Sequence, residues 1–520
     1  MCRARCSAAA VRARAAVHVG VWRSDAGLCP FPALRIVQTR ADVAARGRSS
    51  GRIMPYPRTL LVGFALSSVL WPGSASGAEP CPWRCRAFEH LWSDRFGDGR
   101  EQVGLSVAVD GEQNVILAGY AAGEVDFGGG PVEPSGPASA FVAKFDPWGD
   151  LIWARRFASS SGDSFASGVT VDLDDDIFLT GAFRSSIDFG GGPLTNFGGG
   201  ATAFVVKLTP DGDHVWSRGA TGNDEQTPRG VVVDGEGNVS IAGSFRGTLD
   251  FTGGAEPIVS AGSEDAFASS FDAAGTPLWS EAFGGPQIDR GNALAVDSRG
   301  NLLLTGFFTS SGIDFGGGSL PFAGSGDIFV AKLDPGGRHV WSHGYGDAGS
   351  QDGAGVAVGP RDEVVVTGSM FGTVDFGGAP LTSAGDNDVL VLKLDARGRH
   401  VWSRRFGDAE RQDGTSIAVD RWGMIAVTGF FRGSIRFGGC EALAGAGTED
   451  IFLAELDPWG NPFRSTSAGD AAPQFPTSVA YGDVGEVLLT GYFDGVMDFG
   501  GAPLVSRGGR DVFLVKLAGW

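Results

Sequence analysis

A carboxylate recurs through this chain inside the tripeptide Asp-Phe-Gly, and a ring of such carboxylates could bind cations. The seven positions are 61 to 64 residues apart, and the third copy ends in threonine: Asp126, Asp188, Asp250, Asp314, Asp375, Arg436 and Asp498. The alternative is structural, with each Asp accepting backbone N–H groups in a loop and each Phe packing between repeats. Arg436 replaces the carboxylate without other change to its repeat, which favours the structural interpretation.

Histidine is the usual acid or base near neutral pH. Four of the five histidines after residue 78 share one position, two residues before a recurring tryptophan: His90, His214, His339 and His400. We interpret them as one strand position seen four times rather than as catalytic groups. The fifth, His343, lies two residues after its tryptophan.

The most acidic stretch holds Asp172, Asp174, Asp175 and Asp176. Alternating carboxylates suit calcium, but this loop lacks the glycine and the distal glutamate of an EF-hand. It also occupies the position that is a hairpin turn in the other repeats. A solvated turn is favoured, and calcium stays open as a cofactor.

Familiar catalytic motifs do not occur in a suitable setting. No Gly-x-Ser-x-Gly elbow stands between a strand and a helix, and glycine runs such as Gly128–Gly130 precede no helix that would present N–H groups to phosphate. Four residues that break the repeat are the candidates if the protein is a hydrolase, a lyase or a quinone-dependent oxidoreductase: Arg436, Cys440, Glu455 and Tyr481. Sequence drift also explains them, so we predict no catalytic, cofactor-binding or metal-binding residue.

Seven copies of one repeat position all of these residues. Each copy has four short apolar runs separated by turn residues, the pattern of four strands without long helices. An aromatic residue marks the last run of each copy: Trp92, Trp153, Trp216, Trp279, Trp341, Trp402 and Phe463. Continuously apolar runs such as Asp388–Leu392 need cover on both faces. The sequence predicts an all-β, seven-bladed β-propeller of four-stranded blades.

The two ends of the repeat region predict how the ring closes. The region opens on a lone tryptophan strand at His90–Ser93 and stops after a third strand at Asp511–Leu517. The two ends therefore complete one blade, which removes the two sheet edges that the end strands would otherwise expose. A glycine near the end of every second run predicts close approach of two backbones there: Gly119, Gly181, Gly243, Gly306, Gly368, Gly429 and Gly491.

From about Leu91 to Leu517 the chain resembles the bacterial β-propeller repeats of the SBBP type. The resemblance rests on Val-Asp-x-x-Gly-Asn at Val296–Asn301, Thr-Gly-x-Phe at Thr428–Phe431 and Phe-Val-x-Lys-Leu-Asp at Phe329–Asp334. A weaker similarity links Lys332–Trp341 with the tryptophan-docking repeat of quinoprotein propellers, which resemble eight-bladed rings. The SBBP resemblance implies a secreted or envelope scaffold and implies little about chemistry.

The amino-terminal region shares nothing with the repeats. Residues 1–53 carry ten arginines and two acidic residues, and we interpret them as an over-extended reading frame or a disordered leader. Residues 54–78 look like a secretory signal, with an apolar run of 12 residues ahead of small residues. That run is too short to span a bilayer. Residues 79–88 form a short linker, and 89–520 form the propeller.

Six cysteines occur along the chain: Cys2, Cys6, Cys29, Cys81, Cys85 and Cys440. The last three remain if residues 1–78 are removed. An exported compartment permits a disulfide between Cys81 and Cys85. Cys440 is then expected to be a buried, unreactive thiol.

Charge and loop lengths point to the kind of partner. Removing residues 1–78 takes 11 of 41 basic and 2 of 60 acidic residues, and the remaining net charge of −28 repels nucleic acid and anionic membranes. Long loops join the second and third strands, for example 121–139, so their face is the candidate binding surface. We predict an exported, monomeric, non-enzymatic scaffold that binds a protein or glycan at a bacterial cell envelope. The alternatives are a propeller enzyme and a calcium-dependent adhesion module.

Overall fold

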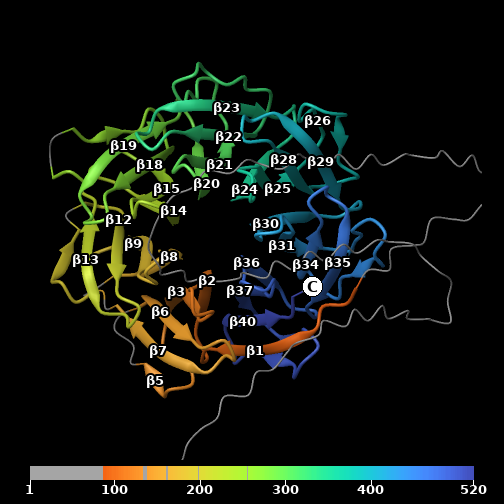
Figure 1. The fold of residues 1–520 in the computed structure, drawn as a ribbon, viewed down its shortest axis with the longest axis horizontal. Helices are drawn as coiled ribbons and strands as arrows, with labels where there is room; N and C mark the ends of the chain where they lie inside the picture. The colour runs from red at the N-terminus through yellow and green to blue at the C-terminus, as the bar shows by residue number, and fades with distance from the viewer. Residues whose placement is uncertain are drawn as a thin grey trace, which may run out of the picture. The chain divides into compact units, whose positions relative to one another are not determined.

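The computed structural model describes residues 86–132, 137–157, 159, 162–196, 198–253 and 256–519. These residues form strands and turns arranged as a ring of seven four-stranded sheets (Figure 1). Residues 1–53, 54–78 and most of the linker lie outside the described part, so the predictions made for them stay predictions. Among the described residues, no helix is long and apolar enough to cross a membrane.

Each sheet, or blade, runs from an innermost strand beside the channel to an outermost strand. Blade 1 is built from β2 (Gln102–Val109), β3 (Val115–Ala121), β6 (Ser139–Phe145) and β7 (Leu151–Arg156). Blade 2 is built from β8 (Ser164–Val171), β9 (Ile177–Phe183), β12 (Thr202–Leu208) and β13 (His214–Gly219). Blade 3 is built from β14 (Gln226–Val233), β15 (Val239–Phe245), β18 (Asp265–Phe271) and β19 (Pro277–Phe283). Blade 4 is built from β20 (Asp289–Val296), β21 (Leu302–Phe308), β22 (Asp327–Leu333) and β23 (His339–Tyr345). Blade 5 is built from β24 (Gln351–Val358), β25 (Val364–Met370), β28 (Asp388–Leu394) and β29 (His400–Phe406).

The last two blades include the one that joins the chain ends. Blade 6 is built from β30 (Gln412–Val419), β31 (Ile425–Phe431), β34 (Asp450–Leu456) and β35 (Pro462–Ala468). Blade 7 is built from β36 (Gln474–Tyr481), β37 (Val487–Phe493), β40 (Asp511–Leu517) and β1 (His90–Phe96). β1 pairs antiparallel with β40, and Arg95 forms an ion pair with Asp511 at 2.7 Å across this closure. The predicted shared blade is confirmed.

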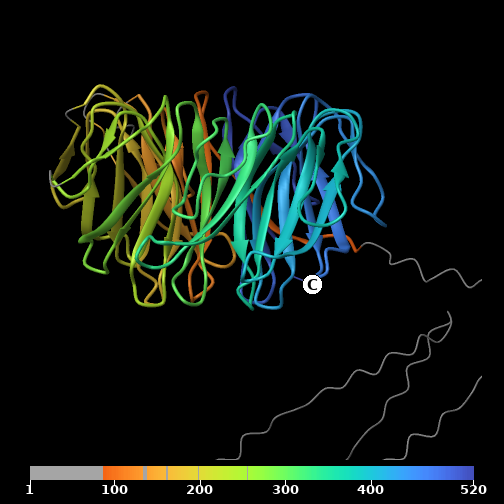
Figure 2. The ribbon, with the colours of Figure 1, turned by 90° about the horizontal axis from the view of Figure 1, so that it is seen from above.

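The strands run between two faces of the ring, as the view in Figure 2 shows. The short turns between the first and second and between the third and fourth strands of a blade lie on one face, which we call the hairpin face. The crossings between blades and the loops between second and third strands lie on the other, the long-loop face. The turn after β22 has the predicted chemistry: Gly337, with φ +79°, donates its N–H to the Asp334 carbonyl.

Six of the long loops contain a small hairpin that the sequence did not predict. These hairpins pair β4 (Val125–Asp126) with β5 (Pro131–Val132), β10 (Ser186–Asp188) with β11 (Pro193–Thr195), β16 (Thr248–Leu249) with β17 (Ile258–Val259), β26 (Thr373–Val374) with β27 (Leu381–Thr382), β32 (Ser434–Ile435) with β33 (Leu443–Ala444), and β38 (Val496–Met497) with β39 (Leu504–Val505). Their strands are only two or three residues long, too short for a periodic pattern to be visible.

The core lies between blades rather than inside one sheet. The third strands are buried along their whole length apart from the half-buried Lys207 of β12, as the continuous apolar runs predicted. The Phe of each Asp-Phe-Gly unit packs where two blades meet. Phe189, for example, lies 4.7 Å from Phe157, which follows blade 1, and 4.8 Å from Phe204 of blade 2, measured between ring centroids.

The recurring tryptophans connect each blade to the next. Trp92 donates its indole N–H to the carbonyl of Pro147 at 3.0 Å and lies against Gly149 in the turn of blade 1. The same hydrogen bond links the five other tryptophans to the following blade. The predicted glycines are also explained, because a Cβ on Gly119 would collide with the Val103 carbonyl oxygen of the paired strand.

Candidate binding site at the channel mouth

A β-bulge at the same place in every innermost strand shapes the channel wall. One extra residue interrupts the pairing of each first and second strand: Leu105, Ser167, Arg229, Asn292, Ala354, Thr415 and Thr477. These seven residues line a cavity of about 230 Å³ in the channel. A β-bulge changes the local direction of side chains, so the equivalent bulge residues of the seven repeats face the lumen of the channel.

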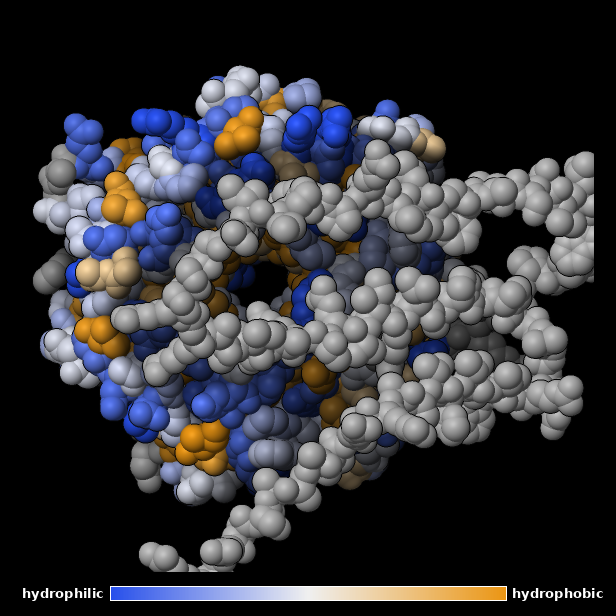
Figure 3. Space-filling model, in the orientation of Figure 1, coloured by the Kyte–Doolittle hydropathy of each residue, from blue (hydrophilic) through white to orange (hydrophobic). Residues whose placement is uncertain are grey.

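The residues of the channel wall differ from one side of the ring to the other. On blades 3 to 6 the wall carries charged and amide side chains: Arg229, Arg290, Asn292, Asp352 and Asp413. At the position two residues before the bulge, which holds Arg290, Asp352 and Asp413 on blades 4 to 6, blades 7, 1 and 2 have the apolar residues Phe475, Val103 and Phe165. The bulge residue itself is apolar in blade 1, at Leu105, and a hydroxyl residue in blades 2 and 7. Figure 3 shows the ring hollowed at its centre, with hydrophilic and hydrophobic residues around the opening.

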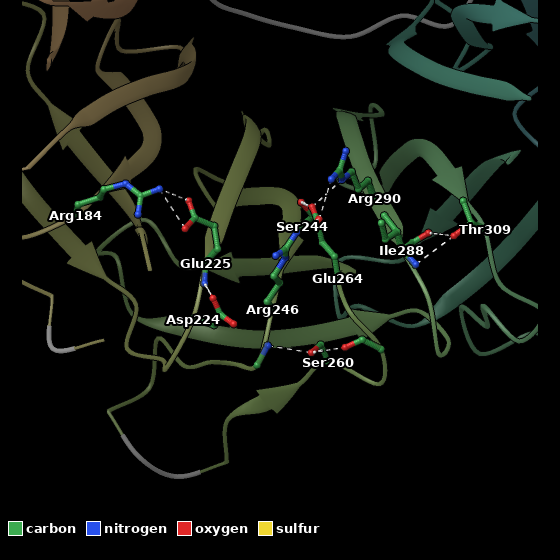
Figure 4. A network of polar contacts seen from close by, with 12 residues as sticks. Arg184, Asp224, Glu225, Ser244, Arg246, Ser260, Glu264, Ile288, Arg290 and Thr309 are labelled. Carbon is green, nitrogen blue, oxygen red and sulfur yellow. Dashed lines mark hydrogen bonds and ion pairs between the residues drawn. The ribbon is translucent and has the colours of Figure 1, made fainter. Parts of the chain in front are cut away.

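A polar pocket opens between blades 3 and 4 at the long-loop end of the channel. Its volume is about 190 Å³, and its lining includes Arg229, Arg246, Glu264 and Arg290. Glu264 precedes β18 and receives two hydrogen bonds from Arg290, at 2.7 and 2.9 Å (Figure 4). Arg246 lies 3.3 Å from the same carboxylate. One buried carboxylate therefore holds two guanidinium groups in place.

Glu264 stays ionised over the whole physiological range. Burial acts to raise the pKa of Glu264, but hydrogen bonds from Arg290 and Ser244 and the charge of Arg290 outweigh burial and hold the pKa at about 2. The Ser244 hydroxyl donates to the carboxylate at 2.7 Å. A second pair, Arg184 with Glu225 at 2.9 Å, lies at the rim of the pocket (Figure 4).

Asp352 and Asp413 continue the polar wall on blades 5 and 6. The side-chain amide of Asn292 donates to Asp352 at 2.8 Å, and the Arg411 guanidinium donates to Asp413 at 2.6 Å. Burial and then the negative charge of Asp413 raise the pKa of Asp352 to about 6, against the opposing charges of Arg229 and Arg290. This carboxyl group therefore changes charge close to neutral pH.

The aspartates of the Asp-Phe-Gly units serve as loop caps. Asp126 accepts N–H groups from Gly128 at 2.8 Å and Gly130 at 3.0 Å. Equivalent bonds occur at the other aspartates of the series. Arg436 is exposed in the same position of blade 6. These contacts agree with the structural interpretation of the repeat.

The four equivalent histidines also have structural contacts. His214 Nε2 lies 3.1 Å from the Ser217 hydroxyl, and its ring lies against Gly191 of the adjacent loop. The other three make the same contact with a serine three residues later. His343 packs between Trp341 and Tyr345, and burial lowers its pKa.

The acidic stretch after β8 is a turn bound to a lysine. Lys207 Nζ lies 3.2 Å from Asp172 Oδ2 and 2.8 Å from Asp176 Oδ2. Asp175 accepts a backbone N–H from Gly111 of the neighbouring blade at 2.7 Å. Within the described ranges, no group of three or more histidine, cysteine or acidic residues is placed to hold a metal ion.

Two of the repeat-breaking residues form a buried network at the interface of blades 6 and 7. Glu455 accepts from the Tyr481 hydroxyl at 2.7 Å and from the Arg464 guanidinium. Burial and then the Glu455 charge raise the pKa of Tyr481 well above its usual range. In five other blades a lysine replaces Glu455 and pairs with an acid of the first turn: Lys144, Lys207, Lys332, Lys393 and Lys516.

The prediction of a free buried thiol at Cys440 is wrong. Cys440 is buried, with 3% of its surface exposed, and it is disulfide-bonded. The other five cysteines all precede Arg86, outside the described residues. No cysteine spacing in the sequence indicated this bond.

Sequence reasoning did not single out Arg229 or Glu264. In an alignment of the seven repeats Arg229 is the only charged residue of its column, and Glu264 precedes the third strand where Gly326 stands in blade 4. Two exposed aromatic residues on the hairpin face were not predicted from the sequence either: Trp148 and Trp459, at the tips of turns, are 76% and 70% exposed. Both belong to the Asp-Pro-Trp-Gly version of the outer turn.

Together these features define a seven-bladed β-propeller with a charged and aromatic channel mouth. No family model matches the sequence. The chain is 20% identical over 505 residues to the uncharacterized WD repeat-containing protein L264 of Acanthamoeba polyphaga mimivirus, across 78% of this chain and 36% of that protein. The chain thus spans about a third of the length of this curated relative. The similarity to a WD-repeat protein agrees with a propeller built of repeats.

Solved propellers resemble the chain more distantly. The WD40 β-propeller domain of Doa1 is 9% identical, with a TM-score of 0.38 over 83% of this chain and 97% of that one. YCF48 bound to D1 peptide is 10% identical, with a TM-score of 0.40 over 84% and 98%. The polysaccharide lyase Uly1 is 10% identical, with a TM-score of 0.42 over 80% and 90%. The fold assignment rests on the sheet order above, not on these scores.

Proposed function

We propose that this protein is an exported, non-enzymatic β-propeller scaffold that binds a protein partner at a bacterial cell envelope through the channel mouth on the long-loop face. The supporting observation is a set of arginines placed over aromatic rings there. Arg290 lies 5.8 Å from the Phe307 ring centroid, and Arg510 lies 4.9 Å from that of Tyr492. Arginine and aromatic residues contribute most of the binding energy at protein interfaces.

The export and family parts of the proposal rest on the sequence. The features of residues 54–78 support a cleaved signal, and the units at 296–301 and 329–334 support SBBP-type repeats. Amino-terminal sequencing of the protein from fractionated cells tests export. We expect a mature start at Glu79 in the envelope or secreted fraction; an uncleaved protein in the cytoplasm would contradict it.

Site-specific photo-crosslinking tests the binding face. A photoreactive phenylalanine analogue replaces Tyr492 at the channel mouth or, as the control, the 91% exposed Leu173 on the hairpin face. In the producing cells we expect a discrete adduct from position 492 that contains peptides of a second protein, and none from 173. An adduct from 173 alone would place the interface on the hairpin face. An adduct that glycosidase returns to the size of the propeller alone would identify a glycan partner instead.

A further inference from the structure

Arg229 differs from the six residues at the equivalent bulge. In blades 2, 6 and 7 the hydroxyls at this position donate to backbone carbonyls of the next blade, as Ser167 does to Pro228 at 2.7 Å. Among the described residues, the Arg229 guanidinium forms no hydrogen bond or ion pair, and its side chain is exposed to the lumen. It lines both the channel cavity and the polar pocket, and it is the only charged residue in the lining of the former.

The surroundings of Arg229 favour an anion. Arg229 is exposed only to the enclosed lumen, and desolvation there, followed by the positive charge of Arg290, lowers the pKa of Arg229. Glu264 already neutralises Arg290 and holds it in position, so an incoming anion meets a preorganised neighbour and one unpaired guanidinium. A planar guanidinium matches a carboxylate with two parallel hydrogen bonds.

The charge of the anion is limited by the acids around it. The negative charges of Glu264 and Asp352 act on Arg229, and the charge of Asp413 acts on Asp352. A dianion such as phosphate would experience more repulsion from these carboxylates than a singly charged group. Apolar side chains take the strand position of Arg290 on two other blades: Phe165 on blade 2, beside blade 3, and Phe475 on blade 7.

We propose that the channel mouth binds a carboxylate group that is attached to an apolar body, with Arg229 as its ion-pairing partner. This inference rests on the proposed function, because the partner would supply the carboxylate from an acidic side chain or a chain end. The apolar body then contacts Leu105, Phe165 and Phe475, which belong to blades 1, 2 and 7.

Calorimetric titration of the full processed chain with short peptides tests this inference. Three probes share one apolar sequence: the first has a free carboxyl terminus, the second is amidated with one internal Asp, and the third is amidated with Asn in its place. We expect the first or second to bind about tenfold more tightly than the third, as for a charge-assisted hydrogen-bonded pair. Acetate and inorganic phosphate, titrated alone, report whether a free anion suffices.

Two charge-matched variants assign the effect. Arg229→Gln should remove the preference for the carboxylate, whereas Arg299→Gln, an exposed arginine on the hairpin face, should keep it. An unchanged melting temperature in both variants shows that folding is intact. Equal affinity for all three peptides, stronger binding of phosphate, or a preference that survives Arg229→Gln would overturn the inference. The crosslink from position 492 is an independent test. An adduct from position 492 together with equal affinity for all three peptides refutes only the carboxylate site. A carboxylate preference without any adduct from position 492 refutes only the proposed protein-binding function.

Discussion

Trp279 donates its indole N–H to the backbone carbonyl of Pro335, 2.9 Å away in the neighbouring blade. Its ring also lies against Gly337, where a Cβ would come within 2.8 Å of the indole. The tryptophan is half-buried, so it belongs to a joint between blades and not to the interior of a sheet. Glycine is required in the turn both for its positive φ and for this close approach.

Replacing Trp279 with alanine should destabilise the ring by about 2 to 3 kcal/mol, less than the 3 to 5 kcal/mol of a fully buried tryptophan. Trp279→Phe keeps most of the apolar contact and loses the hydrogen bond, so about 1 kcal/mol is expected. Urea unfolding of both variants measures the difference. If Trp279→Ala melts like the wild type, the blade joint contributes nothing.

The pairing of β1 with β40 makes ring closure sensitive to the last strand. Deleting residues 511–520 removes the partner of β1 and exposes two sheet edges, so stability and solubility should fall together. Hydrogen exchange at Leu91–Phe96 should lose its protection. The control deletion 518–520 leaves β40 intact and should leave protection unchanged. Persistent protection after the longer deletion would mean that β1 does not depend on β40.

The repeat made the ring predictable, whereas the role of residues that depart from the repeat could be assigned only from the structure. Seven copies with an unpaired strand at each end specify a closed seven-bladed ring, and the glycine of each second strand indicated the close backbone approach. Phe463 is an exception with a structural reason. Its tryptophan equivalents dock on a turn of the next blade, but in blade 7 the chain ends replace that turn. Arg86 lies over the Phe463 ring instead, 5.6 Å from its centroid.

The candidate site could not be read from the repeat, because deviation alone does not separate a site from drift. Arg436 and Arg229 both break their columns. Arg436 lies exposed in a loop, whereas Arg229 faces the lumen because it occupies the bulge. The position of the bulge depends on the pairing register of two strands, and no single residue in the sequence predicts that register.

Loss of Glu455 should be costly because it would leave Arg464 charged and unpaired with only 3% of its surface exposed. We expect Glu455→Ala to lower the free energy of unfolding by about 3 to 5 kcal/mol. The double variant Glu455→Lys with Arg464→Ser restores the pattern of the other blades, with Asp420 in the place of the turn acid. It should recover most of the loss in urea unfolding. A single variant with an unchanged midpoint would show that the pair contributes little.

The disulfide of Cys440 should be detectable by peptide mapping without reduction. The Cys440 peptide should be joined to a second cysteine-containing peptide, and reduction should separate the two. Cys440→Ser should lower stability by about 2 to 4 kcal/mol. A reductant should lower the melting temperature of the wild type to that of the variant and leave the variant unaffected. Alkylation of Cys440 in the native, unreduced protein would contradict the bond.

Asp352 gives folding stability a pH dependence of defined sign. Burial first and the charge of Asp413 second raise the pKa of Asp352 from 3.8 to about 6, although Arg229, Arg290 and the Asn292 amide oppose the shift. The folded pKa exceeds the unfolded one, so the folded state binds the extra proton between these values. The contribution of Asp352 is therefore fully present below about pH 4 and lost as the pH rises through 6.

Asp352→Asn removes this titration and keeps an acceptor for Asn292. The full shift corresponds to at most about 3 kcal/mol, and exposure to the lumen reduces the expected effect to about 1 kcal/mol. Relative to the wild type, the variant should gain this stability between pH 4 and pH 7 in urea unfolding. Asp211→Asn, at an exposed aspartate on the hairpin face, should show no such gain. A stability difference for Asp352→Asn that stays constant or falls with pH would show that Asp352 titrates as an ordinary solvated acid.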